Sequence, residues 1–327
     1  MRNKQLIIDW LTDVIHEEYQ NSILEKMILP IFVNNKSKKL RPLVVLLCYR
    51  LIAGEDSDEQ LLKYICSAIE ICHNASLIVD DVFDRDELRR GKASFFVEFG
   101  TFAAISSAYN LSAFVFDLAA RTNNNEIVKE LGRVGTALSS ALYLSKDLRS
   151  KEIVSEEFFM DLLHRKTSAL FESSARCGGL LATNDKEKLD LLGRFGKLFG
   201  YSYQLRDDVL AIIGSIEELG KEPDSDITNR FQSLITIEAF RLANTADKKI
   251  LSDYYLRQTD VDPETIRSIL IESGAINAVI QKTEEYREEA GELLNQFPDS
   301  VSRRLLLELL SIINFNSIKQ YALVKNP

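Results

Sequence analysis

Carboxylates are concentrated in the stretch from residue 73 to 94, which reads H-N-A-S-L-I-V-D-D-V-F-D-R-D-E-L-R-R-G-K-A-S. On a helix, four of its polar residues are spaced by three, four and four positions and share one face: His73, Ser76, Asp80 and Asp84. Asp80 and Asp84 lie one turn apart with Asp81 beside them, so their charges repel unless a cation lies between them. Hard oxygen ligands without a nearby Cys-His cluster favour Mg²⁺, which keeps several waters and bridges to substrate phosphates.

The sequence directly after this acidic face is basic, because Arg89, Arg90 and Lys92 follow within a few positions. Cations beside a metal-binding face can hold a diphosphate, whose oxygens accept charge-assisted hydrogen bonds. Taken alone, the run D-D-V-F-D-R-D-E would suit a solvated surface turn equally well, because charge runs are usually exposed.

A second pair of aspartates, Asp207 and Asp208, favours the metal site over the surface turn. The pair lies in Y-Q-L-R-D-D-V-L, inside the apolar helical stretch from 189 to 213. On a helix, Gln204, Asp207 and Ala211 share one stripe. Two Asp-Asp pairs, each within an otherwise apolar helix, are costly to leave in a core without a metal ion.

Length, composition and charge are those of an ordinary globular protein with an acidic balance. The 327 residues suit one large domain or two ordinary ones, and 46% hydrophobic with 27% charged residues allow a sizeable core. The net charge of −9 argues against a nucleic acid as a main partner, because phosphate binding would need a basic face. Local clusters of lysine and arginine can still hold a small phosphorylated ligand.

Cysteine usage and hydropathy predict a cytoplasmic protein. The four cysteines form no C-x-x-C pair and lie in apolar surroundings, which is typical of buried free thiols in a reducing compartment: Cys48, Cys66, Cys72 and Cys177. Asp9 comes too early for a signal peptide, and the apolar run after Pro42 meets Arg50 before it could span a bilayer. We therefore expect no transmembrane segment.

Helical periodicity dominates the chain and strand-type alternation is scarce, so we predict an all-α fold. One amphipathic helix is expected from 3 to 27, ended by Pro30, and Pro42 opens the next. Residues 215–232 form the longest polar loop, and shorter helices follow it. Between these, we expect helices at 43–53, 58–86, 101–121, 126–147, 155–182 and 186–213.

Five separated motifs resemble those of the trans-isoprenyl diphosphate synthases, also called polyprenyl synthases, and occur in the order of that family. S-K-K-L-R-P (37–42) resembles G-G-K-R-x-R-P, and D-D-V-F-D-R-D-E-L-R-R-G-K (80–92) resembles the first Asp-rich motif with its arginine pair. R-K-T-S-A-L-F (165–171) matches the K-T motif, and Y-Q-L-R-D-D-V-L (203–210) resembles the second Asp-rich motif. L-G-K-E-P-D-S-D-I (219–227) resembles the G-K-x-x-G-x-D loop. The C-terminal helices carry no motif that we can match.

The resemblance implies a single domain over residues 1–327: an all-α bundle of antiparallel helices around a deep central cavity, with both acidic faces at its mouth. It also implies a homodimer formed through helices. The implied activity is the Mg²⁺-dependent joining of an allylic diphosphate to isopentenyl diphosphate. In that family's pattern, Asp80, Asp84 and Asp207 ligate Mg²⁺, and Asp81 and Asp208 support them.

Two diphosphate sites are implied in the same way. Five residues correspond to the allylic site: Arg89, Lys166, Thr167, Gln204 and Lys221. Four correspond to the isopentenyl diphosphate site: Lys38, Arg41, His73 and Arg90. An allylic C–O bond ionises only if the charge growing on the departing diphosphate is neutralised, and the carbocation needs an apolar cavity without water. Isopentenyl diphosphate then attacks, and a proton is lost to the diphosphate, so no separate base is needed.

Several positions depart from the family's pattern: Val79, Ala108, Tyr109, Leu142, Ser145, Ala211 and Phe231. Ala211 stands where the second motif usually has a third Asp, and Phe231 stands where a Lys usually follows the S-D-I loop. These changes weaken diphosphate binding and leave two alternatives open. One is a terpene cyclase that evolved from a synthase, and the other is a non-catalytic subunit of a heteromeric synthase. We favour the synthase, because a cyclase has no use for the isopentenyl diphosphate residues and an inactive subunit has no use for either set.

The residues one turn before the first Asp pair, Ala75 and Ser76, are expected to line the cavity wall. In the resembling family, bulky aromatic residues at these places stop the chain at the farnesyl stage. Small residues let the growing chain pass, so we expect geranylgeranyl diphosphate or a longer product.

Overall fold

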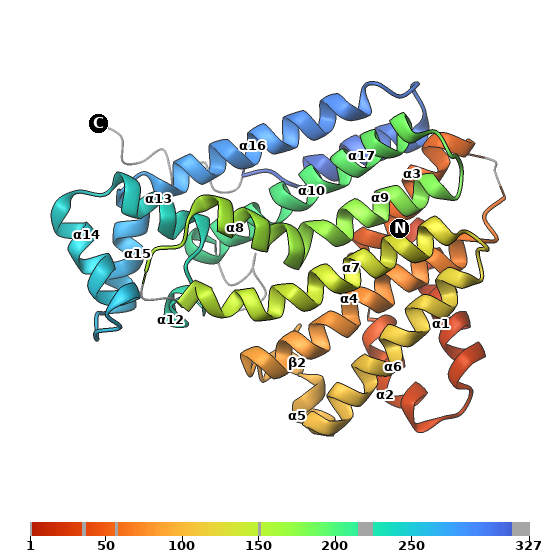
Figure 1. The fold of residues 1–327 in the computed structure, drawn as a ribbon, viewed down its shortest axis with the longest axis horizontal. Coiled ribbons are helices and arrows are strands. Elements are labelled where there is room, and N and C mark those ends of the chain that lie inside the picture. The colour runs from red at the N-terminus through yellow and green to blue at the C-terminus, as the bar shows by residue number, and fades with distance from the viewer. Residues whose placement is uncertain (1, 35–36, 56–57, 150–151, 215–224, 316–327) are drawn as a thin grey trace.

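Helices α4 (Leu62–Asp84) and α10 (Lys186–Ile213) carry the two acidic motifs, and α9 (Ala169–Leu180) packs against both. The computed structural model describes residues 2–34, 37–55, 58–149, 152–214 and 225–315, and nearly all of its regular structure is helical (Figure 1). The predicted all-α class is confirmed.

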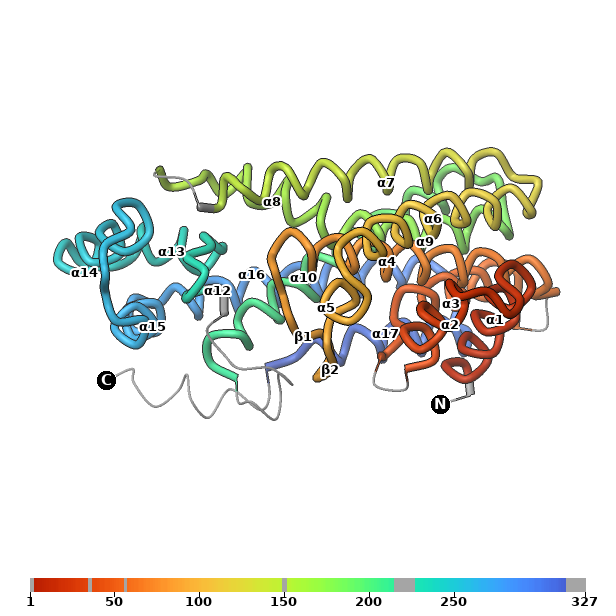
Figure 2. The backbone as a smooth tube through the Cα atoms, turned by 90° about the horizontal axis from the view of Figure 1, so that it is seen from below, coloured from red at the N-terminus to blue at the C-terminus, as the bar shows by residue number. Residues whose placement is uncertain are grey.

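The remaining elements follow one another with mostly short connections. Helices α1 and α2 lie at one end of the molecule and α13 to α15 at the other (Figure 2). In chain order these elements are α1 (Arg2–Tyr19), α2 (Ile23–Phe32), α3 (Leu40–Ala53), β1 (Leu88–Arg89), β2 (Lys92–Ala93), α5 (Phe95–Phe99), α6 (Thr101–Ala120), α7 (Asn125–Leu144), η1 (Ser145–Arg149), α8 (Glu156–Leu163), η2 (His164–Ser168), α12 (Ser225–Thr228), α13 (Leu234–Leu242), α14 (Thr245–Leu251), η3 (Ser252–Leu256), α15 (Pro263–Glu272), α16 (Ala275–Leu294) and α17 (Val301–Ser311).

The N-terminal segment differs from the single helix expected over residues 3–27. Asn21 has a left-handed backbone with φ 59° and separates α1 from α2. The Ser22 side chain then caps α2 by accepting a hydrogen bond from the Glu25 amide at 3.1 Å. Pro30 lies inside α2 and does not end it. The break was missed because so short a polar step interrupts an otherwise continuous apolar pattern.

Helix α4 is shorter than expected at both ends. It begins at Leu62 rather than at 58, and it ends at Asp84 because Arg85 takes a left-handed conformation with φ 58°. Part of the polar loop expected over 215–232 is also helical, since α12 lies within it. The other helices predicted between residues 43 and 213 occur within a few residues of their expected bounds, with η2 interrupting the one expected at 155–182.

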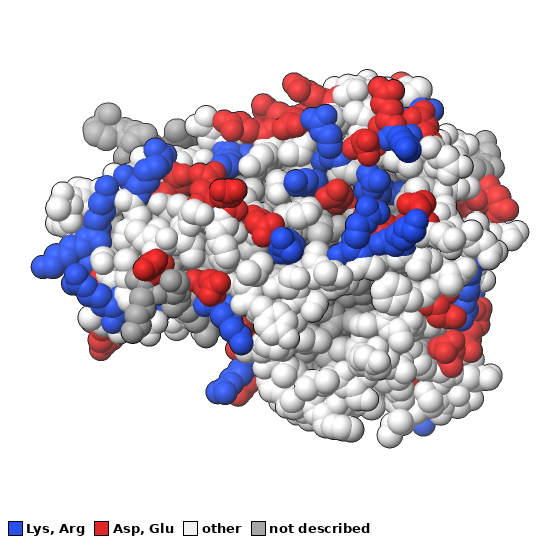
Figure 3. All heavy atoms as spheres, viewed as in Figure 1, with Lys and Arg blue, Asp and Glu red and all other residues white. Residues whose placement is uncertain are grey.

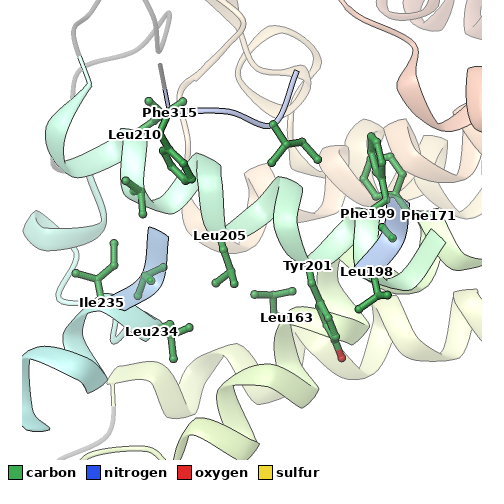
Figure 4. Packing of buried hydrophobic residues seen from close by; sticks show 14 of the residues in the cluster. Leu163, Phe171, Leu198, Phe199, Tyr201, Leu205, Leu210, Leu234, Ile235 and Phe315 are labelled. Atoms are coloured by element: carbon green, nitrogen blue, oxygen red, sulfur yellow. The ribbon is translucent and has the colours of Figure 1, made fainter. Parts of the chain in front are cut away.

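Two clusters of buried apolar side chains fill the interior. One surrounds α10, where Leu198, Tyr201 and Leu205 recur at helical spacing and face the neighbouring helices (Figure 4). The other cluster joins α1, α4 and α6, with Ile69 and Leu111 among its fully buried members. Most of α4 therefore belongs to one cluster and most of α10 to the other, although Leu189 of α10 joins the α4 cluster, and α9 packs against both helices.

Two glycines allow α10 to approach α9 and η2 closely. A Cβ atom at Gly196 would lie 2.5 Å from the Phe171 carbonyl oxygen, and one at Gly200 would lie 2.6 Å from Ser168 Cα. Any larger residue at these places would push the helices apart. The close contact holds η2 beside the segment of α10 that carries the second acidic motif.

Helix α6 combines a buried side with an apolar exposed side. Among the described helices it alone is long and apolar enough to cross a membrane, and 44% of its most apolar window is buried inside the protein. Its outer side exposes Phe102, Ile105 and Tyr109, by 88%, 55% and 81%. Figure 3 shows a wide area without charged atoms over this part of the molecule. Exposed apolar patches of this kind often mark interaction sites in proteins.

Candidate active site

Helix α4 presents Asp80 and Asp84 on one face and Asp81 on another. Asp80 is half-buried and Asp84 is exposed, and within the described part of the chain neither forms an ion pair. Asp81 is only 2% exposed and accepts a hydrogen bond from Arg89 Nε at 2.8 Å. The protein itself therefore neutralises the middle carboxylate and leaves the outer two available.

The electrostatics of Asp80 favour an added cation. Its pKa is raised, chiefly because burial disfavours the carboxylate, and the charges of Asp84 and Asp81 raise it further. Lys166 opposes this rise, which places its positive charge near the same face. A bound divalent cation would lower the pKa of Asp80 and keep it ionised.

A β-hairpin that the sequence did not predict carries the arginine pair. Strand residues Arg89 and Lys92 pair with each other, and the turn residues Arg90 and Gly91 have φ of 55° and 75°. Two positive φ values are typical of a type I′ turn, for which Gly91 is well suited and Arg90 is unusual. Arg89 is held by Asp81, whereas Arg90 forms no ion pair with any residue that the structure describes.

Two side chains expected to bind isopentenyl diphosphate, Arg41 and His73, are in contact, and the charge of a third, Arg90, acts on the same imidazole. Arg41 Nη1 donates to His73 Nε2 at 3.2 Å, and the Arg41 guanidinium lies 4.3 Å from the centre of the Phe171 ring. The pKa of His73 is lowered well below its usual value, first by burial and then by the charges of Arg41 and Arg90. The imidazole is therefore neutral at neutral pH and accepts a hydrogen bond from Arg41. Lys38 lies exposed on the turn that precedes α3.

The motif comparison overlooked a buried ion pair in the same place. Lys39 Nζ lies 2.8 Å from Glu70 Oε1, and the two side chains are 0% and 2% exposed. Asn74 Nδ2 donates to the same oxygen at 3.0 Å. Because Lys39 stands between Lys38 and Arg41, the pair holds their turn against α4. Glu70, an acid within an apolar stretch of α4, was the signal that sequence reasoning could have used.

The second half of the site is organised by η2, a π-helical turn that carries Lys166 and Thr167. Such turns are frequent at functional sites. Lys166 is exposed and Thr167 is buried, and Thr167 Oγ1 donates to Gln204 Oε1 at 2.9 Å. Gln204 Nε2 donates in turn to Asp208 Oδ1 at 2.8 Å. Three residues that the motifs singled out thus form one hydrogen-bonded chain.

Tyr203 connects the two halves. Its ring centre lies 5.6 Å from that of Phe171, the ring that Arg41 covers. Burial raises the pKa of Tyr203, Asp207 raises it further, and the charge of Arg41 lowers it. Asp207, which also lies 3.5 Å from Arg206 Nη1, and Arg41 therefore both lie near this ring.

Some expected site residues are not brought together. Across the described ranges, no group of three His, Cys, Asp or Glu side chains is placed to hold a metal ion by itself. Lys221 lies outside the described residues. Phe231 lines a small cavity of about 10 Å³ together with Asp208, and Ala211 is buried, so apolar side chains occupy two places where the family usually has polar ones.

The two residues expected to limit product length differ in surroundings. Ala75 is buried in the cluster that joins α1, α4 and α6. Ser76 is half-buried, and its hydroxyl donates to the His73 carbonyl oxygen at 2.8 Å. Their role in product length stays a prediction.

Known proteins with similar sequences and structures are prenyl synthases. A family model described as polyprenyl synthetase matches residues 21–272. The geranylgeranyl diphosphate synthase of Methanosarcina mazei is 29% identical over 282 residues, which cover 85% of each chain. The geranylfarnesyl diphosphate synthase of Aeropyrum pernix is 30% identical over 286 residues, 84% of this chain and 89% of that one.

Solved structures agree with the sequence comparison. A polyprenyl synthase from Caulobacter crescentus, complexed with calcium and isoprenyl diphosphate, has a TM-score of 0.86 at 26% identity over 95% of both chains. The geranylgeranyl pyrophosphate synthetase from Pyrococcus horikoshii has a TM-score of 0.84 at 27% identity, over 96% of this chain and 99% of that one.

Proposed function

Because this chain belongs to the polyprenyl synthetase family, as its motifs predict, we propose that it is a trans-prenyltransferase that condenses isopentenyl diphosphate with an allylic diphosphate. The product is geranylgeranyl diphosphate or a longer all-trans prenyl diphosphate, in keeping with the names of its relatives. The helical fold is that of its structural neighbours, the prenyl synthases.

The observation that carries this proposal is the pairing of two kinds of site. Asp80 and Asp84 form an acidic face without ion-pair partners in the described part of the chain, and Arg41 contacts His73 beside it. An enzyme that only ionises an allylic diphosphate needs the first site alone, and a non-catalytic subunit needs neither. The named relatives are synthases, which favours chain elongation over both alternatives.

The residues fit Mg²⁺, which we propose as the metal cofactor. Mg²⁺ is usually bound by one or two carboxylates together with substrate phosphates and waters, so a group of three protein ligands is not required. Asp80 and Asp84 supply such carboxylates one turn apart, and the raised pKa of Asp80, caused first by burial and then by the neighbouring carboxylates, supports a cation there. Asp207 would complete the set from α10. When bound, the metal neutralises the charge that grows on the departing diphosphate.

The chain's own residues would bind and orient the two substrates and would exclude water. Lys166 lies near Asp80 and would hold the allylic diphosphate from the exposed side. Arg41 and Arg90 would hold the second diphosphate and aim its alkene at the allylic carbon. Tyr203, which packs against Phe171 between the two halves, would shield a carbocation from water. His73 is neutral and already accepts a hydrogen bond from Arg41, so the proton lost from the alkene goes to the diphosphate.

The deciding experiment is incubation with Mg²⁺ and an allylic diphosphate, with and without isopentenyl diphosphate. We expect a longer prenyl diphosphate only when both substrates are present, and reversible loss of turnover on addition of EDTA. A hydrocarbon or alcohol formed without isopentenyl diphosphate would replace this proposal with a cyclase. No turnover at all, together with a synthase that co-purifies with the chain, would replace it with a non-catalytic subunit.

We also propose that the chain is a single-domain, cytoplasmic protein that forms a homodimer. The apolar outer side of α6, with Phe102 and Tyr109, suits a second copy better than water. Buried free thiols such as Cys48 and Cys66 suit a reducing compartment. Phe102→Asp should give a monomer in sedimentation, whereas Phe83→Asp, at another exposed phenylalanine, should not. A wild type that sediments as a monomer, or that co-purifies with a different chain, would contradict the homodimer.

A further inference from the structure

A pocket of about 260 Å³ lies between α2, α4, α5 and the β-hairpin. Its wall on α4 is formed by Asn74, Leu77, Ile78 and Asp81, whose spacing places them on one stripe. Each residue of a helix is rotated by roughly 100° about the helix axis relative to the one before it. The centre of this stripe therefore lies about a quarter turn around α4 from the face that carries Asp80. The pocket therefore adjoins the catalytic face and shares Asp81, Arg89 and Arg90 with it as a common border.

The inner lining of the pocket is largely apolar. Met27, Pro30 and Ile31 line it from α2, and Phe95 and Phe99 line it from α5. Phe95 is buried, whereas Phe99 is 36% exposed at the edge of the pocket. Such a lining suits a hydrocarbon chain, because it removes apolar surface from water on both sides.

The rim of the same pocket carries an excess of positive charge. Its charged lining residues are Lys26, Arg89, Arg90 and Lys92 against Asp81 and Glu98. Arg89 is already paired with Asp81. Lys26, Arg90 and Lys92 form no ion pair with any residue in the described ranges. Unpaired cations at the edge of an apolar pocket favour an anionic group there.

Two buried polar atoms in the lining lack protein partners. Ser94 and Asn74 are each 1% exposed, and Ser94 Oγ and Asn74 Oδ1 have no hydrogen-bond partner in the part of the chain that the structure describes. Asn74 already donates through Nδ2 to Glu70, so only its oxygen is left. The Ser94 hydroxyl can donate a hydrogen bond to an anion near the hairpin. Buried polar atoms without hydrogen bonds cost free energy. This indicates that a ligand, or water molecules bound with it, forms the missing hydrogen bonds to both atoms.

From these observations we propose that the pocket binds a small anionic amphiphile. Its hydrocarbon chain lies between α2 and α4, and its phosphate or carboxylate head lies at Lys26 and Lys92, two lining cations that the proposed reaction does not use, near Ser94. Both a prenyl phosphate and a fatty acid have this chemistry. The site is additional to the two diphosphate sites of the proposed reaction and does not depend on that reaction.

Binding of dodecyl phosphate to the full chain, measured by calorimetry in EDTA, tests the proposal without the metal-dependent site. We expect saturable binding of one molecule per chain and at least tenfold weaker binding of dodecanol, which lacks the anionic head. Ile31→Trp should fill the pocket and weaken binding at least tenfold. The matched control is Ile23→Trp, on the same helix but 79% exposed and outside the lining, which should bind as the wild type does.

A second variant keeps the test valid if Ile31→Trp does not fold. Lys26→Glu reverses a charge at an exposed residue and should weaken dodecyl phosphate binding about tenfold without changing the melting temperature. Equal binding of the wild type, Ile31→Trp and Lys26→Glu would overturn the proposal, and so would loss of binding in Asp80→Ala. Farnesyl phosphate and dodecanoate, compared with dodecyl phosphate, separate the two sources, and tight binding of either supports the site. If the protein elongates prenyl chains but binds no amphiphile in EDTA, the proposed amphiphile site is wrong while the proposed function stands.

Discussion

The acidic ends of α4 and α10 use the same residue types, but the protein satisfies them to different degrees. On α4, Asp80 and Asp84 are left without ion-pair partners in the described part of the chain, and only Asp81 is bound, by Arg89. On α10, Asp208 accepts a hydrogen bond from Gln204, and Asp207 lies beside Arg206. One face is open to a cation, and the other is already organised by protein contacts.

The two unequal halves indicate how a two-sided metal site can be assembled. An open pair of carboxylates attracts cations and is unfavourable without them: burial raises the pKa of Asp80 most, and the charge of Asp84 raises it further. A hydrogen-bonded pair of carboxylates is stable by itself, but it has to rearrange or share its oxygens before it can bind a metal ion. We infer that the α4 face supplies most of the metal affinity and that the α10 face completes the site when the substrate diphosphate is bound.

Removal of a metal carboxylate should have the largest effect. Asp80→Ala and Asp207→Ala should each lower kcat by more than about 10²-fold, because each removes charge neutralisation at the leaving group. If α4 supplies the metal affinity, Asp80→Ala should also raise the Mg²⁺ concentration needed for half-maximal rate more than Asp207→Ala does. Steady-state rates over a Mg²⁺ titration measure both. Near-normal turnover of either variant at saturating Mg²⁺ would refute the assignment.

The second largest effect should be a change in substrate KM that distinguishes the isopentenyl diphosphate site from the allylic site. Arg41→Ala removes a charged hydrogen-bond donor, a loss of about 1.5–3 kcal/mol, and should raise KM for isopentenyl diphosphate about tenfold or more with little change for the allylic primer. Lys166→Ala, on the side that faces α10, should affect the primer at least as much as isopentenyl diphosphate. Initial rates with each substrate varied in turn show the split. Equal effects of the two variants on both substrates would mean that the sites are not separate.

A change of product should follow from a change of bulk on α4. Ala75→Phe or Ser76→Phe should shorten the main product by at least one isoprene unit without abolishing turnover, because a ring in the path blocks the growing chain. Chromatography of the dephosphorylated products of wild type and variants is the measurement. A wild type that stops at farnesyl diphosphate, or unchanged products in both variants, would place the floor of the cavity elsewhere.

A smaller effect concerns stability without metal. The folded-state pKa of Asp80 is raised, so the folded protein gives up this proton less readily than the unfolded chain, and stability falls as pH rises from about 4 through the folded-state pKa. Asp80→Asn should therefore raise the melting temperature in EDTA at neutral pH by on the order of 1–2 °C. The difference should vanish below about pH 4. Asp81→Ala, which removes the acceptor of the Arg89 hydrogen bond at a buried position, should lower the melting temperature instead.

The smallest effect is expected where this chain departs from its family on the α10 side. Ala211→Asp and Phe231→Lys restore the usual residues, and in a working synthase they should leave kcat unchanged or improve primer KM by no more than about threefold. Ala211 is buried, so Ala211→Ser serves as a control for polarity without charge. An increase of kcat above about tenfold would show that the departures limit the enzyme, and would weaken the inference that the α4 face dominates.

Sequence reasoning was most successful where a helix alone decides the geometry. The helical period places His73, Asp80 and Asp84 on one face whatever surrounds them, and the structure forms α4 over this stretch. The bounds of α10 were predicted to the residue because an apolar pattern runs from one polar break to the next. The family's motifs then pointed to Arg41 and His73, and the structure places these two in contact.

Tertiary structure alone decided which of these residues are free and which are bound. Arg89 binds Asp81 through a hairpin whose turn needs positive φ at Arg90, and Lys39 binds Glu70 although 31 positions separate them along the chain. The pocket beside α4 exists because α2 is a separate helix that packs there. Periodicity specifies the face on which a side chain lies, since that depends on neighbours three or four positions away. A side chain's partner depends on the packing of distant segments, which a single sequence read locally does not contain.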